Sequence, residues 1–334
     1  MSRTWAACLV VVIAGVGLCA QRSAEPAPAP GLPIVGIAGI AFKVSDLDKA
    51  RAHYGGVLGF AEAFDIKDSA GKITSAFFKV NDTQYIEIVP GLKAGELIRQ
   101  ARVIIQASDL NTLRRIYVER GLQPSAIAPG ADGNPTFRIV DPAGANLDFL
   151  QYVPGSRQSE ARGKFLSATR VSTHILHVGI WVNDRPTSAA FYQEKLGFEQ
   201  GRLLPGGTGE YVETMTGGRD VETKNPPLDP NNPATRAQYE REQHGSVHHV
   251  CLEVPDIRVA RDLVQRRGGY DDVRVRAHVG NNRHWLLHIF DADGSRAELM
   301  EPTAQETLPA MTVMLPGPVA PPMVPKTPGV IPWP

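Results

Sequence analysis

The chain has 334 residues, with 35 Lys and Arg against 35 Asp and Glu, so its formal net charge is zero. This balance leaves no electrostatic footprint for nucleic acid or for an anionic membrane surface. Two of the three cysteines, Cys8 and Cys19, lie in an apolar N-terminal segment, which leaves Cys251 alone and excludes a disulfide framework. A chain of this length can bury a sizeable core and is expected to form two domains.

The N-terminal segment predicts export. An apolar run from Trp5 to Ala20 follows Arg3; it is short for a membrane span, which needs about 20 residues, but fits the apolar region of a secretory signal. Residues 1–20 are therefore expected to be a signal peptide for a periplasmic or secreted protein. An uncleaved anchor helix and a lipoprotein signal at Cys19 are the alternatives. Proline-rich residues 21–33 are expected to be a linker, and residues 303–334 a disordered tail.

Four copies of one unit follow in chain order, each reading as a strand, a helix and further strands. Each copy contains an Asp that is expected to cap its helix, and a Gly that ends the helix. The residue seven positions before this Asp is His only in the last two copies. In chain order, the four pairs are Gly39 and Asp46, Arg102 and Asp109, His177 and Asp184, and His249 and Asp256.

The end of each copy is expected to be a strand that carries an acidic residue. Glu87, Asp148 and Glu298 lie 41, 39 and 42 residues after the capping Asp of their copies, and Glu222 lies 38 residues after Asp184. Such regular spacing argues for duplicated supersecondary units. It also determines which residues of the four copies are equivalent in space.

The repeat equivalence selects a candidate metal site in the second half of the chain. Eight of nine histidines lie after residue 170, and His177 and His249 hold equivalent positions on the first strands of their copies. With Glu298 from a final strand, two imidazoles and one carboxylate can bind one divalent cation and leave positions open for substrate. The donor set suits Fe, Zn, Mn, Ni or Co and does not choose among them.

Two further residues have alternative interpretations. Glu222 is either a fourth metal ligand or a surface acid beside a polar insertion between Pro226 and Gly245. His288, ten residues before Glu298, is either a catalytic acid/base or hydrogen-bond donor near the metal, or a polar residue on the outer face of the sheet.

The first half is expected to be structural and free of metal. Gly39 has no side chain with which to bind a metal, and Arg102 is itself a cation. Both residues stand where the second half has histidine.

The four copies of the unit resemble the vicinal oxygen chelate superfamily, which includes glyoxalases, bleomycin and fosfomycin resistance proteins and extradiol dioxygenases. The residues that carry the resemblance are the two His-Val-x-x-x-Val-x-Asp segments that begin at His177 and His249, Phe191-Tyr192 before Leu196-Gly197-Phe198, the turn Asp291–Gly294, and Ala297-Glu298-Leu299. The resemblance covers residues 34 to 302. It implies an α+β fold of four βαβββ modules, paired into a metal-free domain at 34–153 and a metal-binding domain at 172–302.

Two versions of the site follow from the resemblance. An extradiol dioxygenase-like site matches His177, His249 and Glu298 as ligands; those enzymes usually hold a tyrosine where this chain has His288, and His244 does not match their acid/base histidine. A glyoxalase-like site adds Glu222. Either version predicts a metal-dependent enzyme that acts on a small molecule with vicinal oxygens, and a homodimer is compatible with both. The alternative is a non-catalytic protein that sequesters a small molecule.

Overall fold

In a computed structural model of the protein, the described residues are 31–96, 98–181, 185–203, 209–213, 221–224, 245–269, 277–280 and 282–304. The expected signal peptide, most of the linker, Asp184, the insertion after Pro226 and the tail after Ala304 lie outside them. The described residues from Leu32 onward belong to one compact unit. Its division into two independently folding domains stays a prediction.

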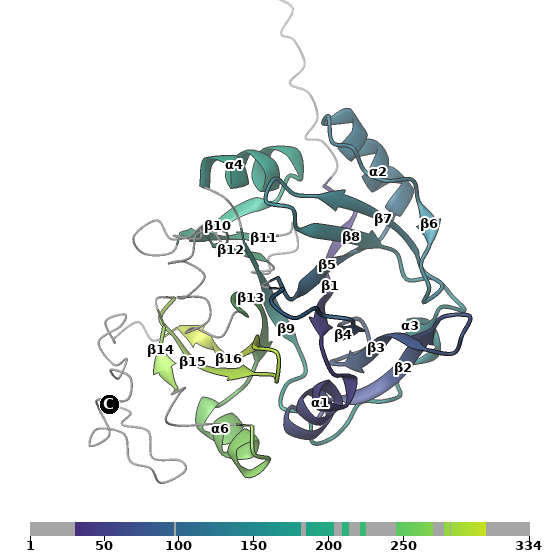
Figure 1. Ribbon diagram of the computed structural model, residues 1–334. Coiled ribbons are helices and arrows are strands. Elements are labelled where there is room, and N and C mark those ends of the chain that lie inside the picture. The colour runs from purple at the N-terminus through teal and green to yellow at the C-terminus, as the bar shows by residue number, and fades with distance from the viewer. Residues whose placement is uncertain are drawn as a thin grey trace, which may run out of the picture. The chain divides into compact units, whose positions relative to one another are not determined.

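The protein has the expected α+β fold, in which each of the four copies is a βαβββ module (Figure 1). The first half consists of β1 (Ile34–Val44), α1 (Leu47–Arg51), η1 (Ala52–Val57), β2 (Ala61–Lys67), β3 (Ile73–Lys79), β4 (Tyr85–Pro90), β5 (Gln100–Ala107), α2 (Leu110–Glu119), β6 (Ala128–Pro129), β7 (Pro135–Val140) and β8 (Asn146–Leu150). A short helix, α3 (Arg157–Glu160), follows. The second half consists of β9 (Ile175–Trp181), α4 (Arg185–Ala189), η2 (Ala190–Lys195), β10 (Glu199–Leu203), β11 (Gly209–Glu213), β12 (Val221–Lys224), β13 (Gly245–Glu253), α6 (Ile257–Arg266), β14 (His278–Val279), β15 (His284–Phe290) and β16 (Ser295–Ala304).

Each half forms one eight-stranded sheet, and the two sheets have the same order. The first is β2-β3-β4-β1-β5-β8-β7-β6, and the second is β10-β11-β12-β9-β13-β16-β15-β14. The first strands of two modules therefore pair at the centre of each sheet, β1 with β5 and β9 with β13, both antiparallel. This pairing places equivalent residues of consecutive modules side by side.

The predicted helix signals are confirmed wherever the structure describes them. Asp46, Asp109 and Asp256 cap their helices by accepting hydrogen bonds from backbone N–H groups of the first turn. The stop glycines adopt the left-handed conformation that glycine tolerates best, with φ of 76° at Gly59, 78° at Gly121, 77° at Gly197 and 75° at Gly268.

Two helices differ from the simple α-helix that the periodicity predicts. In the first and third modules the helix widens after α1 and α4 into the π-helical turns η1 and η2. Each π-helical turn carries a fully buried tyrosine, Tyr54 or Tyr192, whose hydroxyl bonds to an aspartate of the other half of the chain. A local sequence pattern does not report such a contact.

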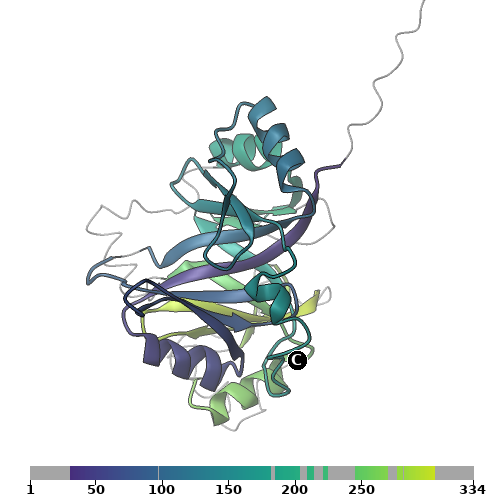
Figure 2. The ribbon, with the colours of Figure 1, turned by 90° about the vertical axis from the view of Figure 1, so that its right-hand side faces the viewer.

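The two halves share one hydrophobic core, because a single cluster of buried side chains runs from Leu32 through Leu299. Figures 1 and 2 both show α1 beside α6, and α2 beside α4. The Arg267 guanidinium donates to the Val57 carbonyl at 3.0 Å, and Arg120 donates to the Lys195 carbonyl at 3.3 Å. At each pair of neighbouring helices, an arginine from one half therefore bonds to the backbone of the other half.

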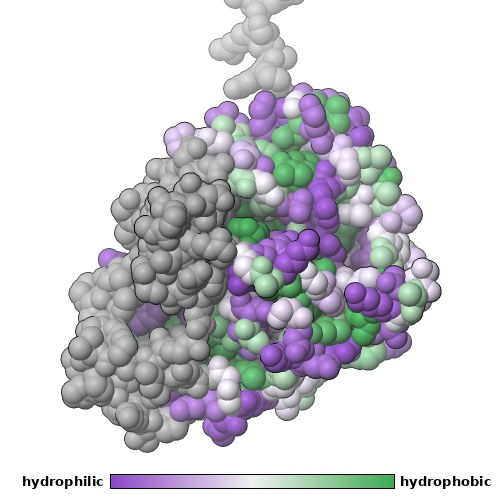
Figure 3. Space-filling model, viewed as in Figure 1, coloured by the Kyte–Doolittle hydropathy of each residue, from purple (hydrophilic) through white to green (hydrophobic). Residues whose placement is uncertain are grey.

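On the face seen in Figure 3, the described residues show hydrophobic and hydrophilic side chains interspersed. Within the described part of the chain, no helix is both long and apolar enough to cross a membrane.

Candidate metal centre

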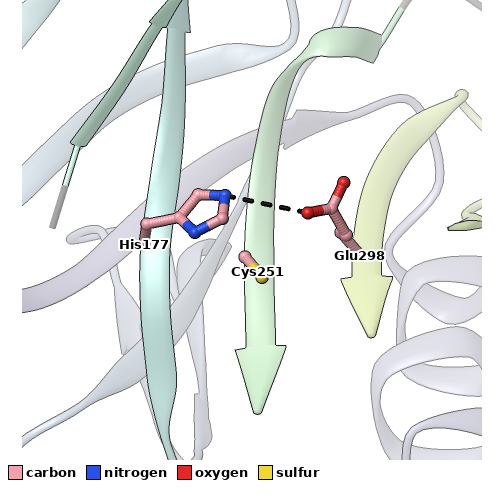
Figure 4. A group of neighbouring side chains, drawn as sticks. All are labelled: His177, Cys251 and Glu298. Atoms are coloured by element: carbon pink, nitrogen blue, oxygen red, sulfur yellow. Dashed lines mark ion pairs between the residues drawn. The ribbon is translucent and has the colours of Figure 1, made fainter. Parts of the chain in front are cut away.

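One row of paired residues crosses four neighbouring strands of the second sheet. His177 on β9 pairs with Cys251 on β13, Cys251 with Glu298 on β16, and Glu298 with His288 on β15. Figure 4 shows the His177 ring and the Glu298 carboxylate extending toward each other, with Cys251 on the strand between them. Paired residues on adjacent strands project from the same face of a sheet, so the register itself gathers these side chains.

A second row lies beside the first and supplies the other predicted histidine. It runs from Glu222 on β12 through Gly179 on β9 and His249 on β13 to Arg296 on β16. The Nε2 atoms of His177 and His249 are 3.1 Å apart, and 3.8 Å separates His177 Nε2 from Glu298 Oε1. The structure thus brings together His177, His249 and Glu298, and all three are buried.

His288 is held against the carboxylate of Glu298. Its Nε2 lies 2.9 Å from Glu298 Oε2, which leaves Oε1 as the oxygen nearer His177. Burial, together with the charge of Arg296, lowers the pKa of His288 to about 3, so the ring is neutral near pH 7 and its N–H donates to Glu298. This geometry favours the interpretation of His288 as a hydrogen-bond donor that orients Glu298, rather than as an acid/base catalyst.

Glu298 is an ionised carboxylate despite its burial. Burial raises its pKa, but the hydrogen bond from His288 and the charge of Arg296 outweigh that cost and hold the pKa of Glu298 well below its usual range. The site therefore offers a buried negative charge to a cation.

Cys251 belongs to the same cluster and was not predicted as a site residue. Its Sγ and single ligand atoms of His177 and Glu298 all lie within 4.8 Å of one another, and Cys251 is fully buried. The available signal is strand alternation, since residues 249 and 251 of one strand share a face. A lone cysteine carries no spacing signal of its own.

Arg296 was also not predicted as a site residue, and it contacts two of the predicted ligands, His249 and Glu298. Its Nη2 lies 2.6 Å from His249 Nδ1 and 3.7 Å from Glu298 Oε2, and the side chain is 5% exposed. A guanidinium has only N–H donors, so this contact requires a lone pair on Nδ1 of His249. In a neutral ring the proton is then on Nε2, where it points toward His177.

Glu222 is placed by its backbone only, because its side chain lies outside what the structure describes. Glu222 pairs with Gly179 at the position of the second sheet that corresponds to the pairing of Glu87 with Ala41 in the first sheet. Its role as a ligand stays a prediction.

The first sheet contains the same two rows with different chemistry. Gly39, Ile104, Asp148 and Arg138 form the first row, and Glu87, Ala41 and Arg102 form the second. The Arg102 guanidinium forms an ion pair with Glu87 and lies 3.5 Å from Asp148 Oδ2. A Cβ added at Gly39 would lie 2.1 Å from the Tyr85 carbonyl oxygen, so no side chain fits there. An arginine cation therefore joins the two acids that correspond to Glu222 and Glu298.

Residues 174–299 match the model of the Glyoxalase/Bleomycin resistance protein/Dioxygenase superfamily. These residues therefore belong to the vicinal oxygen chelate superfamily. Among curated proteins, none matches the sequence.

Solved structures of a glyoxalase and of two dioxygenases have the same fold over most of the chain. The Mn(II)-bound glyoxalase from Novosphingobium aromaticivorans is 15% identical, with a TM-score of 0.60 over 81% of this chain and 83% of its own. The 2,3-dioxygenase LapB from Pseudomonas sp. KL28 is 17% identical, with a TM-score of 0.60 over 84% of this chain and 97% of its own. A mutant of homoprotocatechuate 2,3-dioxygenase from Brevibacterium fuscum is 18% identical, with a TM-score of 0.60 over 84% and 75%. At these identities the likeness concerns the fold alone.

The donor set of the vicinal oxygen chelate domain fits a divalent ion in spacing. Bonds of about 2.0–2.2 Å place neighbouring ligand atoms of one ion roughly 3.0–3.5 Å apart, close to the separations of 3.1 and 3.8 Å found here. One contact in the site, between Arg296 and His249, must change before a metal can bind. A ligating histidine normally donates its second N–H to an acceptor, and Arg296 offers His249 only donors. Metal binding through His249 Nε2 thus requires Arg296 to leave Nδ1.

Proposed function

We propose that this protein is a divalent-metal-dependent enzyme that acts on a small molecule with vicinal oxygens. The observation that carries the proposal is the convergence of His177, His249 and Glu298 from three adjacent strands into one buried cluster. Imidazole and carboxylate ligands of this kind suit Fe, Mn, Zn, Ni or Co. One ion per chain is expected, all of it in the second half.

Within this proposal the residues of the chain have separate roles. His177, His249 and Glu298 would hold the metal, which supplies Lewis acidity toward substrate oxygens. His288 orients Glu298 through the 2.9 Å hydrogen bond and leaves Oε1 for the metal. Because His177, His249 and Glu298 are buried, little water reaches them and their electrostatic interactions are strengthened.

The proposal covers two chemistries that the ligand count separates. Three protein ligands leave room for a bidentate diol and oxygen, as in the extradiol dioxygenases that the fold resembles. A fourth ligand from Glu222 corresponds to a glyoxalase-type isomerase or lyase. Consumption of oxygen with a catechol, measured beside isomerisation of a thiol adduct of a 2-oxoaldehyde, distinguishes the two.

Metal analysis tests the proposal directly. The wild type, purified without chelator and reconstituted separately with Fe(II), Mn(II) and Zn(II), is expected to retain about one equivalent of at least one metal. His249→Ala is expected to lose it. His174→Ala is the matched control, because His174 is half exposed and contacts Glu253 outside the cluster. No retained metal in the wild type, or equal retention in His249→Ala, would contradict the proposal.

A second candidate function is sequestration of a small molecule without catalysis. The observation that favours it is the contact between Arg296 and His249, which supplies positive charge where a metal would need an acceptor. In that case the wild type binds no metal after reconstitution, yet still binds a small acidic or hydroxylated ligand beside Arg296. The same metal analysis decides between the two candidates.

A further inference from the structure

The first half contains a cavity that the metal chemistry of the second half does not use. It has a volume of about 150 Å³ and lies over the face of the first sheet that carries Glu87, Arg102 and Asp148. A cavity of this size in a protein interior can hold a single benzene ring. Its apolar walls include Ile66, Phe77, Ile104 and Leu150.

Two residues that line this cavity each have a buried polar atom without a hydrogen-bond partner. These atoms are Glu87 Oε2 and the Tyr85 hydroxyl, on residues that are 1% and 2% exposed. The other carboxylate oxygen of Glu87 is saturated, since Oε1 accepts from Ser75 Oγ at 2.6 Å and from Arg102. Leaving a buried polar atom unpaired costs about 1–3 kcal/mol, and more for a charged one. A binding partner for these two atoms would remove that cost.

The charges around the cavity determine the kind of partner. Glu87, Asp132 and Asp148 line it, and Arg102 is its only lining cation among the described residues. Arg102 is already engaged by Glu87 and Asp148. Burial raises the pKa of Glu87, whereas the charge of Arg102 and the hydrogen bonds from Ser75 and Arg102 lower it. In the carboxylate form its free oxygen accepts hydrogen bonds and cannot donate them. The cavity therefore suits a hydrogen-bond donor and disfavours an anion.

We propose that this first-half cavity is a binding site for a small single-ring molecule that carries a hydroxyl or amino group. The ring lies among the apolar walls, and its donor group binds Glu87 Oε2 and the Tyr85 hydroxyl. This site is separate from the candidate metal centre, and the proposal does not depend on metal binding.

Titration of the full-length protein with phenol tests the proposal. The protein is used metal-free and with the His249→Ala substitution, so that the second half does not take up phenol through a metal. Calorimetry is expected to show one phenol per chain. Benzoate, which is an anion, and toluene, which has no donor, are each expected to bind at least about tenfold more weakly.

Two variants locate the binding, and one matched control verifies it. Glu87→Gln is expected to weaken phenol binding about tenfold or more, and Tyr85→Phe by about threefold to tenfold. Tyr117→Phe is the control, because Tyr117 also has a buried hydroxyl without a partner but does not line the cavity. It is expected to bind phenol like its parent.

The pair of tyrosine variants keeps the test decisive if Glu87→Gln does not fold. Each removes a buried hydroxyl that makes no hydrogen bond, so neither is expected to destabilise the fold. Absence of phenol binding, equal affinity for phenol and benzoate, or equal phenol affinity in Tyr85→Phe and Tyr117→Phe would each overturn the proposal.

Discussion

The Tyr192 hydroxyl in the third module donates a 2.8 Å hydrogen bond to Asp141 Oδ2 in the second module. The equivalent tyrosine of the first module, Tyr54, makes the same bond to Asp291 of the fourth module at 3.1 Å. Both tyrosines are fully buried, and both aspartates belong to the turn that precedes a final strand. The duplicated halves are therefore joined by two equivalent contacts.

The Tyr54–Asp291 contact predicts a specific dependence of stability on pH. Burial raises the pKa of Asp291 to about 6, although backbone N–H groups and Tyr54 lower it. The folded protein then holds a proton that an unfolded Asp with a pKa near 3.9 releases, so this group stabilises the fold increasingly as pH falls from 7 to 5. The gain over that range is about 1.4 kcal/mol and is absent in Asp291→Asn.

Urea unfolding of metal-free wild type and Asp291→Asn at pH 5, 6 and 7 checks this prediction. The difference between the two proteins is the readout, because burial lowers the pKa of His53 to about 4 and that group loses stability as pH falls through the same range. In Tyr54→Phe the pKa of Asp291 should rise further and the gain should begin at higher pH. A difference that does not change with pH would contradict the prediction.

The ion pair between Arg102 and Glu87 is expected to stabilise the fold without affecting metal binding. Arg102→Met leaves the buried Glu87 without its cation, which is expected to destabilise the fold by about 3 kcal/mol. The double variant with Glu87→Gln should recover most of this loss, because no charge is then left unpaired. Arg115→Met is the control, since its ion pair with Glu119 is more than half exposed and worth at most about 1 kcal/mol.

Denaturant unfolding of the wild type, Arg102→Met, Glu87→Gln and the double variant forms the double-mutant cycle for this pair, and Arg115→Met is measured beside them. Metal content should equal that of the wild type in all of them, since the first half is predicted to be metal-free. A loss of stability in Arg102→Met no larger than in Arg115→Met would show that Glu87 does not depend on Arg102.

Much of this arrangement could be predicted from the sequence because the repeat carries local signals. Capping aspartates, stop glycines and alternating strands each depend on residues within one module, and the equivalence of His177 and His249 follows from their distance to a cap. The register then explains why Glu298 joins them, as Cys251 pairs with both His177 and Glu298.

The remaining features depend on contacts between modules, which local patterns do not report. The π-helical turns accompany tyrosines that reach the other half, and the importance of Arg296 appears only once β13 and β16 are paired. The cavity of the first half likewise requires side chains from several strands and the loop after Pro129. Residue type alone identified Arg102 as a cation but did not reveal that it joins two acids.

Arg296 is expected to weaken metal binding in the wild type. It places a positive charge 3.7 Å from Glu298 and holds His249 in a form whose Nε2 carries the proton. In Arg296→Gln the amide oxygen can accept from Nδ1–H, which frees the Nε2 lone pair for a metal. Metal affinity, measured by competition with a chelator, should rise about tenfold or more.

Arg296→Lys is the matched variant for this prediction, because it retains the charge and the donor. Its metal affinity should stay near that of the wild type. Weaker metal binding in Arg296→Gln would instead mean that Arg296 supports the site.

Glu222 separates the two enzyme chemistries, and the first half supplies the physical argument. Glu222 pairs with Gly179 as Glu87 pairs with Ala41, and Glu87 binds the cation of Arg102. If the second half uses the same position for its own cation, Glu222 is the fourth ligand. Glu222→Gln should then lower metal affinity at least about tenfold, because a neutral amide replaces a charged ligand. Glu253→Gln, whose carboxylate contacts His174 outside the cluster, should have no effect. Unchanged affinity in Glu222→Gln would leave three protein ligands and open positions for a diol and oxygen, and oxygen consumption with catechol as substrate would then become the deciding measurement.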